Sequence, residues 1–289
     1  MPTSANRSVG GYSIIEIVVA LATASTVGLL ALSSYVFVTR EWQGQGQVLA
    51  TQQSLRDAID ALTQEIRLGG TCLPSAGPAD GSIRPLAGAN TGTSDTITVR
   101  SNVVCASGTV QSPVNSGANQ INLDNVQNFT VSMWAYILSA DTTRGQYFLI
   151  SGVNTSANRL NVDPTTPITS SYPSSSSVYG AESRTYAIDT SGAVPVLTLA
   201  TLGQSAQRAV AGIERLNIRY VLNNPQNCNA DAGTCTIVDL PASASEWASV
   251  RLVELDFGAR SSQQVTGGGV NGFYQLSQVI RVKPRNFVF

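Results

Sequence analysis

The chain has 289 residues, of which 12% are charged, and its formal net charge is −1. It therefore lacks the basic excess with which proteins bind nucleic-acid phosphates, and no direct nucleic-acid binding is expected. The sequence contains no histidine, which excludes Ser-His-Asp and Cys-His catalysis and removes the most common metal ligand.

The N-terminal region combines a short polar leader with a long apolar run. Residues 1–11 carry Arg7 as their only charged side chain and end in Gly10-Gly11. Residues 12–38 are long enough to span a bilayer, which takes about 20 apolar residues. Glu16 is the only charge in this run. A carboxylate at the centre of a membrane helix costs about 2.5–3.5 kcal/mol, so Glu16 is predicted to be functional and to have a partner.

Two simpler interpretations of the apolar run account for less of it. A secretory signal could be cleaved after Ala20-Leu21-Ala22, but Glu16 would interrupt its apolar stretch and the run would continue well beyond the cut. A plain signal anchor fits the length but explains neither the Gly-Tyr junction nor Glu16.

A single long helix is expected from Tyr12 to about Leu68, because no proline occurs between Pro2 and Pro74. Its first part, residues 12–38, is the predicted transmembrane helix. Residues 39–70 form the amphipathic half, with an apolar stripe that should pack on a globular domain. The stripe consists of Leu55, Ile59, Leu62 and Ile66. Gly44 and Gly46 mark a weak point, and Gly69-Gly70 is expected to end the helix.

After Pro74 the pattern becomes that of β-strands separated by turn residues, so residues 71–289 are predicted to be a β-rich globular domain. The expected strands are Thr96–Val103, Asn128–Ile137, Gln146–Gly152, Arg159–Val162, Arg184–Asp189, Val196–Thr201, Glu214–Leu222, Ala248–Gly258 and Phe273–Val282. One helical turn is expected near Ala206–Ala211. One leading helix followed by hairpin-connected strands predicts an α+β fold with antiparallel sheet.

Residues 163–177 are rich in serine, threonine and proline. This composition favours a mobile surface loop. It is interpreted as a tolerated insertion between strands, with an exposed binding or glycan-bearing loop as the alternative.

The four cysteines follow an export segment, which predicts two disulfides in an oxidising compartment. Three pairings are possible. The favoured one joins Cys228 to Cys235 around a short loop, and Cys72 to Cys105 between the end of the helix and an early strand. A zinc site would need all four thiolates, and the wide spacing does not support one.

The order Gly11, Tyr12, Ser13, Ile14, Ile15, Glu16 resembles the cleavage site of type IV prepilins. The resemblance implies that a prepilin peptidase cuts between Gly11 and Tyr12, and that the new amine on Tyr12 is methylated. It also implies a role for Glu16 in filament assembly, where its carboxylate neutralises the Tyr12 amine of a neighbouring subunit. Such a buried pair is suited to setting register between subunits.

Later segments are similar to PilW-type minor pilins and give the resemblance more detail. They are Leu62–Gly70, Ser94–Val99, Ala211–Tyr220, Trp247–Val253 and Val279–Asn286, whereas residues 101–186 match nothing in that family. Major pilins usually carry proline where this chain has Ser33, and phenylalanine is commoner than tyrosine at the position of Tyr12. The missing proline favours a minor subunit, and the resemblance implies a pilin-like fold.

The resemblance implies a minor pilin that helps initiate or cap a type IV pilus, for adhesion, twitching motility or DNA uptake. The alternative is a type II secretion pseudopilin of the J kind. A remote alternative is a membrane-anchored envelope enzyme using carboxylates among Asp231, Asp239, Glu246, Glu254 and Asp256. Solvated or salt-bridged carboxylates are the commoner case, so no enzyme activity, catalytic residue, cofactor or metal is expected.

The expected partners are other minor pilins, the major pilin, the prepilin peptidase and the inner-membrane assembly platform, with membrane lipid as the surroundings before assembly. The expected location is the bacterial inner membrane, as a single-pass protein with a periplasmic domain. After assembly the protein would lie in the pilus at the cell surface.

Overall fold

The computed structural model describes residues 13–92, 94–222, 236–265 and 272–285. One long helix is followed by antiparallel strands and a five-residue helix, which confirms the predicted α+β class. The elements are α1 (Ile14–Leu68), β1 (Leu86–Ala89), β2 (Thr96–Ser101), β3 (Ser107–Thr109), β4 (Gln120–Asn122), β5 (Trp134–Leu138), β6 (Gly145–Asn154), β7 (Arg159–Val162), β8 (Ser177–Gly180), β9 (Glu182–Asp189), β10 (Val196–Thr201), β11 (Gln207–Ala211), β12 (Ile213–Leu222), β13 (Ile237–Val238), α2 (Ala244–Ala248), β14 (Val250–Gln264) and β15 (Phe273–Val282).

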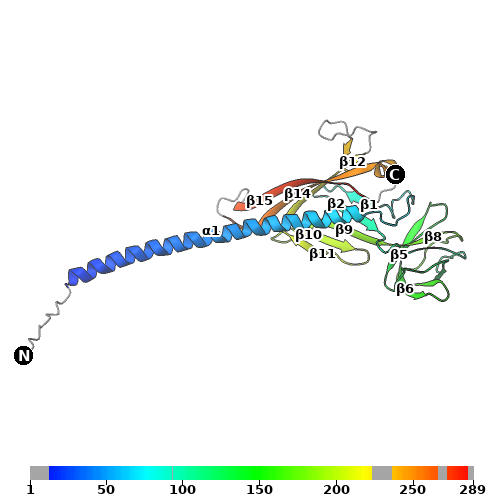
Figure 1. Ribbon diagram of the computed structural model, residues 1–289, viewed down its shortest axis with the longest axis horizontal. Helices are drawn as coiled ribbons and strands as arrows, with labels where there is room; N and C mark the ends of the chain where they lie inside the picture. Colours follow the sequence, from blue (N-terminus) through cyan, green and yellow to red (C-terminus); the bar gives the residue numbers. More distant parts are fainter. Residues whose placement is uncertain (1–12, 93, 223–235, 266–271, 286–289) are drawn as a thin grey trace, which may run out of the picture.

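Helix α1 has 55 residues and is about 80 Å long at 1.5 Å per residue. Its first half projects away from the rest of the molecule, and its second half lies along the sheets (Figure 1). The helix continues through Gly44 and Gly46. The buried face of the second half consists of Thr51, Leu55, Ala58, Leu62 and Ile66, with Ile59 partly buried. The predicted amphipathic stripe is therefore confirmed.

The end of α1 is fixed to the first sheet by the Gly69-Gly70 pair. The Gly69 N–H donates to the Glu65 carbonyl at 2.9 Å, and the Gly70 N–H donates to the Arg100 carbonyl of β2 at 2.9 Å. Gly70 has a φ of 81°, a conformation that side chains with a Cβ rarely adopt. The predicted glycine stop is confirmed, and it also joins the helix to β2.

Two antiparallel sheets and the second half of α1 share one hydrophobic core, and we call this the helix-backed unit. One sheet has five strands in the order β1-β2-β9-β10-β11, and the other has four in the order β13-β12-β14-β15. Helix α1 contacts β11, β14 and β15, and β12 contacts strands of the first sheet. Large core residues come from all three layers, including Leu62, Ile97, Leu197, Tyr220 and Phe257.

Residues 102–181 form a second body, which we call the inserted barrel. Its six strands run in the order β3-β8-β5-β6-β7-β4. An isolated bridge joins Val110 to Leu123, the residues that follow the outer strands β3 and β4, and the Asp124 N–H donates to the Thr109 carbonyl at 2.9 Å. The outer strands therefore meet at their ends, which closes the sheet into a barrel-like body. Its core is separate from that of the helix-backed unit.

The barrel is inserted between two strands that are neighbours in the five-stranded sheet. Strand β2 pairs with β9 in antiparallel register, with Ser101 opposite Glu182, so the chain leaves and returns at one place. Figure 1 shows the barrel at the end of the molecule opposite the N-terminus. The described part of the predicted β-rich region thus holds the two large hydrophobic cores and a smaller cluster formed by Ile83, Tyr136, Leu138 and Ala181.

Most predicted strands are present, and β7, β10 and β15 have the predicted bounds. The strand expected at Asn128–Ile137 begins only at Trp134, because Asn128 and Ser132 both have positive φ in a turn. The helical turn expected near Ala206–Ala211 is wrong, since residues 207–211 are strand β11, paired with β10.

Residues 163–176 lie between β7 and β8 and are mostly exposed or partly exposed, as expected for a surface segment between strands, but the segment also contributes to the barrel core. Ile168 and Tyr172 are each 1% exposed and belong to the barrel core. The backbone of Tyr172 pairs with that of Val114, and the Arg144 guanidinium lies 5.8 Å from the Tyr172 ring centroid. This segment therefore helps to cover the barrel core, and two large side chains anchor it.

Candidate functional site

The first candidate site is the N-terminal turn of α1, where Glu16 lies. Ser13 is the N-cap residue, and its backbone N–H donates to Glu16 Oε2 at 3.0 Å. The carboxylate thus satisfies one of the free N–H groups at the helix start, where the helix dipole also favours negative charge. Glu16 remains exposed, so its carboxylate stays accessible to a further partner.

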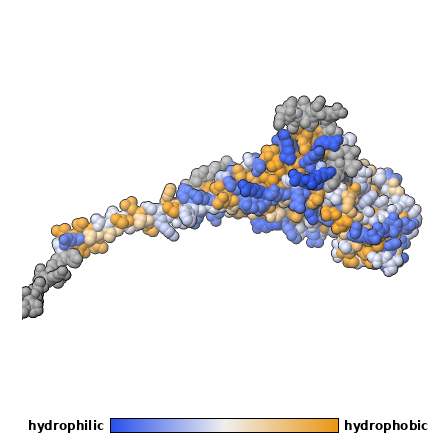
Figure 2. Space-filling view, in the orientation of Figure 1, coloured by the Kyte–Doolittle hydropathy of each residue, from blue (hydrophilic) through white to orange (hydrophobic). Residues whose placement is uncertain are grey.

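An exposed apolar surface surrounds Glu16. Residues 14–38 are all exposed, and large aliphatic side chains are among them, with Ile14 at 80% and Leu30 at 67%. Figure 2 shows hydrophobic residues along this projecting part of the molecule. The helix is long and apolar enough to span a membrane, and none of its apolar window is covered by the rest of the protein. This is consistent with single-pass membrane anchoring.

Several predicted site residues lie outside the described residues. They are Gly11 and Tyr12, for the proposed cleavage and methylation, and Cys228 and Cys235, for the second disulfide. The predictions about them are unchanged.

The disulfide between Cys72 and Cys105 is present, with a Cα–Cα distance of 5.2 Å. Such a separation is typical of disulfides. It joins the segment just after α1 to the segment that enters the inserted barrel. The bond therefore ties the barrel directly to the end of the helix.

Asn102 reinforces the same joint and was not singled out by sequence reasoning. It is 1% exposed, and its side-chain amide donates to the Ala106 carbonyl at 2.9 Å and to the Cys72 carbonyl at 3.3 Å. Its Oδ1 accepts from the Ala106 N–H at 3.1 Å. A Cβ at Gly180 would lie 2.7 Å from this oxygen, so glycine is needed for the close approach. A lone asparagine after a strand gives no sequence signal for such a role.

Two barrel tyrosines hold the loop that follows the disulfide. The Tyr147 hydroxyl donates to the Ser82 carbonyl, and the Tyr136 and Ser82 hydroxyls are hydrogen-bonded to each other. Burial raises the pKa of Tyr147 to about 12, so the phenol stays protonated and able to donate. The barrel is thus fixed to the segment after α1 by a covalent bond and by partly buried hydrogen bonds.

Three of the carboxylates considered for catalysis, Glu246, Glu254 and Asp256, have structural partners, and Glu246 accepts from the Ala242 N–H. Asp239 is exposed. Glu254 accepts from Arg281 at 2.9 Å and lies 3.7 Å from Arg219, on adjacent strands. Asp256 pairs with Arg215 at 3.1 Å. Within the described ranges no cluster of three or more metal-ligating side chains occurs. Asp231 lies outside them.

Comparison with known proteins gives no identification, because no known family matches the sequence and no curated protein is significantly similar to it.

Proposed function

We propose that this protein is a minor pilin, a low-copy subunit that helps to initiate or cap a type IV pilus for adhesion, twitching motility or DNA uptake. The observation that carries the proposal is the exposed Glu16 carboxylate in the first turn of an exposed apolar helix. A plain anchor has no use for an ionised group there, and the group costs free energy in lipid.

The apolar half of α1 supports assembly with other helices. Side chains as exposed as those of Ile14 and Leu30 need lipid or protein around them, because large exposed apolar surfaces mark interaction sites. Before assembly, lipid of the inner membrane would surround residues 14–38. After assembly, the corresponding helices of neighbouring subunits would replace the lipid, with the major pilin and other minor pilins as partners.

The pairing of charges explains why Glu16 is retained. Cleavage after Gly11 by a prepilin peptidase would leave a cationic amine on Tyr12, four residues before the carboxylate. When subunits are staggered along a filament, Glu16 of one meets the amine of another. Each charge then offsets part of the cost of burying the other, whereas a wrong register leaves both charges unpaired.

The disulfide and the arrangement of the two bodies fit this location. Structural disulfides persist in oxidising compartments such as the periplasm, where the Cys72–Cys105 bond would form. The inserted barrel lies at the end opposite the membrane helix (Figure 1). In a filament it would be the part most exposed to the surroundings.

The proposal is tested by replacing Glu16 with leucine or glutamine in the organism that makes the protein. The membrane-fraction level should be unchanged, because the anchor becomes more apolar. The level in sheared filaments should fall about tenfold or more, since a buried charge without its partner costs about 3–5 kcal/mol. Glu41→Gln is the matched control, because Glu41 is exposed on the same helix outside the apolar run.

Equal recovery of the Glu16 variants and the wild type from filaments would contradict the proposal. Recovery of the wild type with a secretion pseudopilus, and not with pili, would instead assign the chain to the J-type pseudopilins.

A further inference from the structure

A groove lies where the inserted barrel meets the helix-backed unit. Its volume is about 410 Å³, within the range of about 300–1,000 Å³ typical of ligand pockets. One wall is formed by residues 130–134 of the barrel, and the other by residues 182–184 and the turn at residues 201–204. Junctions between domains are preferred places for ligand sites.

Trp134, the first residue of β5, supplies an aromatic surface to this groove. Its carbonyl accepts from the Ala181 N–H at 2.9 Å, and its indole lies against the β10–β11 turn. A Cβ at Gly203 would lie 2.5 Å from the Trp134 ring, and Gly203 has a φ of 76°. The indole is half-buried, and its Nε1–H has no hydrogen-bond partner among the described residues.

The other groove side chains are mostly polar and uncharged. Thr130, Ser132, Ser183, Thr201 and Gln204 line it, and their side chains make no hydrogen bond to other described residues. Hydroxyl and amide groups can both donate and accept, so the groove offers uncommitted partners of both kinds beside an aromatic ring. Val104 and Val131, at 46% and 58% exposed, add apolar surface.

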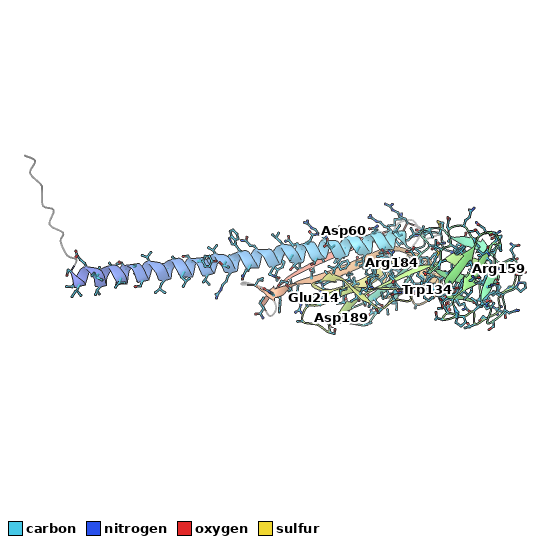
Figure 3. The ribbon with its side chains drawn as sticks, turned by 90° about the horizontal axis from the view of Figure 1, so that it is seen from below. Asp60, Trp134, Arg159, Arg184, Asp189 and Glu214 are labelled. Atoms are coloured by element: carbon cyan, nitrogen blue, oxygen red, sulfur yellow. A yellow bond between two sulfur atoms is a disulfide. The ribbon has the colours of Figure 1, made fainter. Side chains whose placement is uncertain are left out.

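The charged groups of the groove neutralise each other. Arg184 Nη2 lies 3.2 Å from Glu182 Oε2, and Arg184 also pairs with Glu65 of α1. Figure 3 labels Arg184 and Trp134 near the junction with the barrel. Because Arg184, the one cation that lines the described part of the groove, already has two carboxylate partners, this part of the groove is not built for a phosphate, a sulfate or a nucleic acid.

The strands in the walls, β5 and β9, also offer no unpaired edge to an added peptide strand. Strand β5 is paired with β6 and β8, and β9 is paired with β2 and β10. Strand addition needs an unpaired edge. Glu182 is the only carboxylate that lines the described part of the groove, which does not suit a hard cation.

We propose that this groove binds a neutral oligosaccharide, with one sugar ring stacked on the Trp134 indole. The C–H bonds of a pyranose ring pack on an aromatic face, and its hydroxyls need donors and acceptors together. The groove provides the aromatic face and the donors and acceptors, and its charged side chains cancel. The site does not depend on the assignment as a pilin, although in a pilus it would lie at the junction with the inserted barrel, the part farthest from the membrane.

The test uses the full-length protein in a zwitterionic detergent, because detergents with maltoside or glucoside headgroups would themselves present sugar. Binding to an array of neutral, sialylated and sulfated oligosaccharides is measured first, and affinities for the neutral binders follow by calorimetry. Trp134→Ala should weaken binding at least about tenfold. Trp134→Phe keeps a ring but loses the N–H, so a loss of about three- to tenfold is expected.

Gln204→Ala should also weaken binding, whereas Gln207→Ala, an exposed glutamine of β11 outside the groove, should leave it unchanged. Circular dichroism confirms folding, and Trp134→Phe and Gln204→Ala keep the test valid if Trp134→Ala does not fold.

Three results would overturn the proposal: no neutral oligosaccharide bound by the folded wild type, full binding by folded Trp134 variants, or binding confined to acidic glycans. Filament incorporation of the Trp134 variants is scored separately. If the wild type binds no glycan and the Trp134 variants are lost from filaments, the groove receives a neighbouring subunit instead. That result would leave the pilin assignment intact.

Discussion

Glu65, near the end of α1, forms an ion pair with Arg184 in β9, the strand that follows the inserted barrel. The Glu65 side chain is 14% exposed and the Arg184 side chain is 36% exposed. The pair therefore links the helix to the strand through which the chain returns from the barrel. Because Glu65 has little access to water, it depends on Arg184 more than a surface carboxylate would.

We predict that Arg184→Gln lowers the free energy of unfolding by about 1–3 kcal/mol, because it leaves the Glu65 carboxylate without its charged partner. Urea unfolding of the full chain, followed by circular dichroism, measures the change. Arg56→Gln is the control, since Arg56 is exposed on the same helix and should change stability by less than about 0.5 kcal/mol. If the losses in Glu65→Gln and Arg184→Gln simply add in the double variant, the two residues are not coupled.

The Cys72–Cys105 bond closes a loop with a sequence separation of 33, so its removal should be costly. Replacing both cysteines by serine is expected to lower the free energy of unfolding by about 3–4 kcal/mol, through the greater freedom of the unfolded chain. Urea unfolding of oxidised wild type and double variant gives the difference. A change below about 1 kcal/mol would mean that the surrounding hydrogen bonds hold the joint without the bond.

Peptide mapping checks both predicted disulfides at once. Trypsin places Cys72 and Cys105 in the peptides spanning residues 68–100 and 101–144, because it does not cut before Pro85. Both remaining cysteines fall in the peptide of residues 220–251. A cross-link from either of the first two peptides to the third would refute the Cys228–Cys235 pairing.

Processing is predicted to occur between Gly11 and Tyr12. Protein recovered from filaments should have a mass that begins at Tyr12, with one added methyl group. A variant that replaces Gly11 with a bulky residue should keep its leader and stay in the membrane fraction, whereas Gly10→Ala should be processed normally. A mature protein that begins at Thr23 would show that a conventional signal peptidase acts after Ala22.

The sequence predicted those parts of the fold that depend on local patterns. The apolar stripe from Leu55 to Ile66 and the glycine stop after Leu68 each involve only a few turns of helix. Local spacing in the sequence is therefore enough to predict the buried face and the end of the helix. Strand β11 shows the limit. Its sequence Gln-Arg-Ala-Val-Ala has good helix propensity, and pairing with β10 overrides that preference.

The inserted barrel could not be predicted because it depends on distant contacts. Strands β3 and β4 have three residues each, too few to show alternation. The closing bridge and the burial of Tyr172 inside a serine-rich segment both depend on residues that come together only in the folded barrel. The groove likewise depends on the packing of the Trp134 ring against Gly203, and no sequence pattern predicts a contact between residues so far apart in the chain.

The covalent link between Cys72 and Cys105 also determines how the molecule would respond to mechanical force. If the membrane end of α1 is held and the barrel is pulled, the tension passes from Cys105 to Cys72, four residues beyond the end of the helix. Residues 73–104, which include β1 and β2, then carry none of the extension. A pulled subunit would therefore lengthen little at this joint before its noncovalent contacts give way, and reduction of the bond would add the length of that segment to its extension.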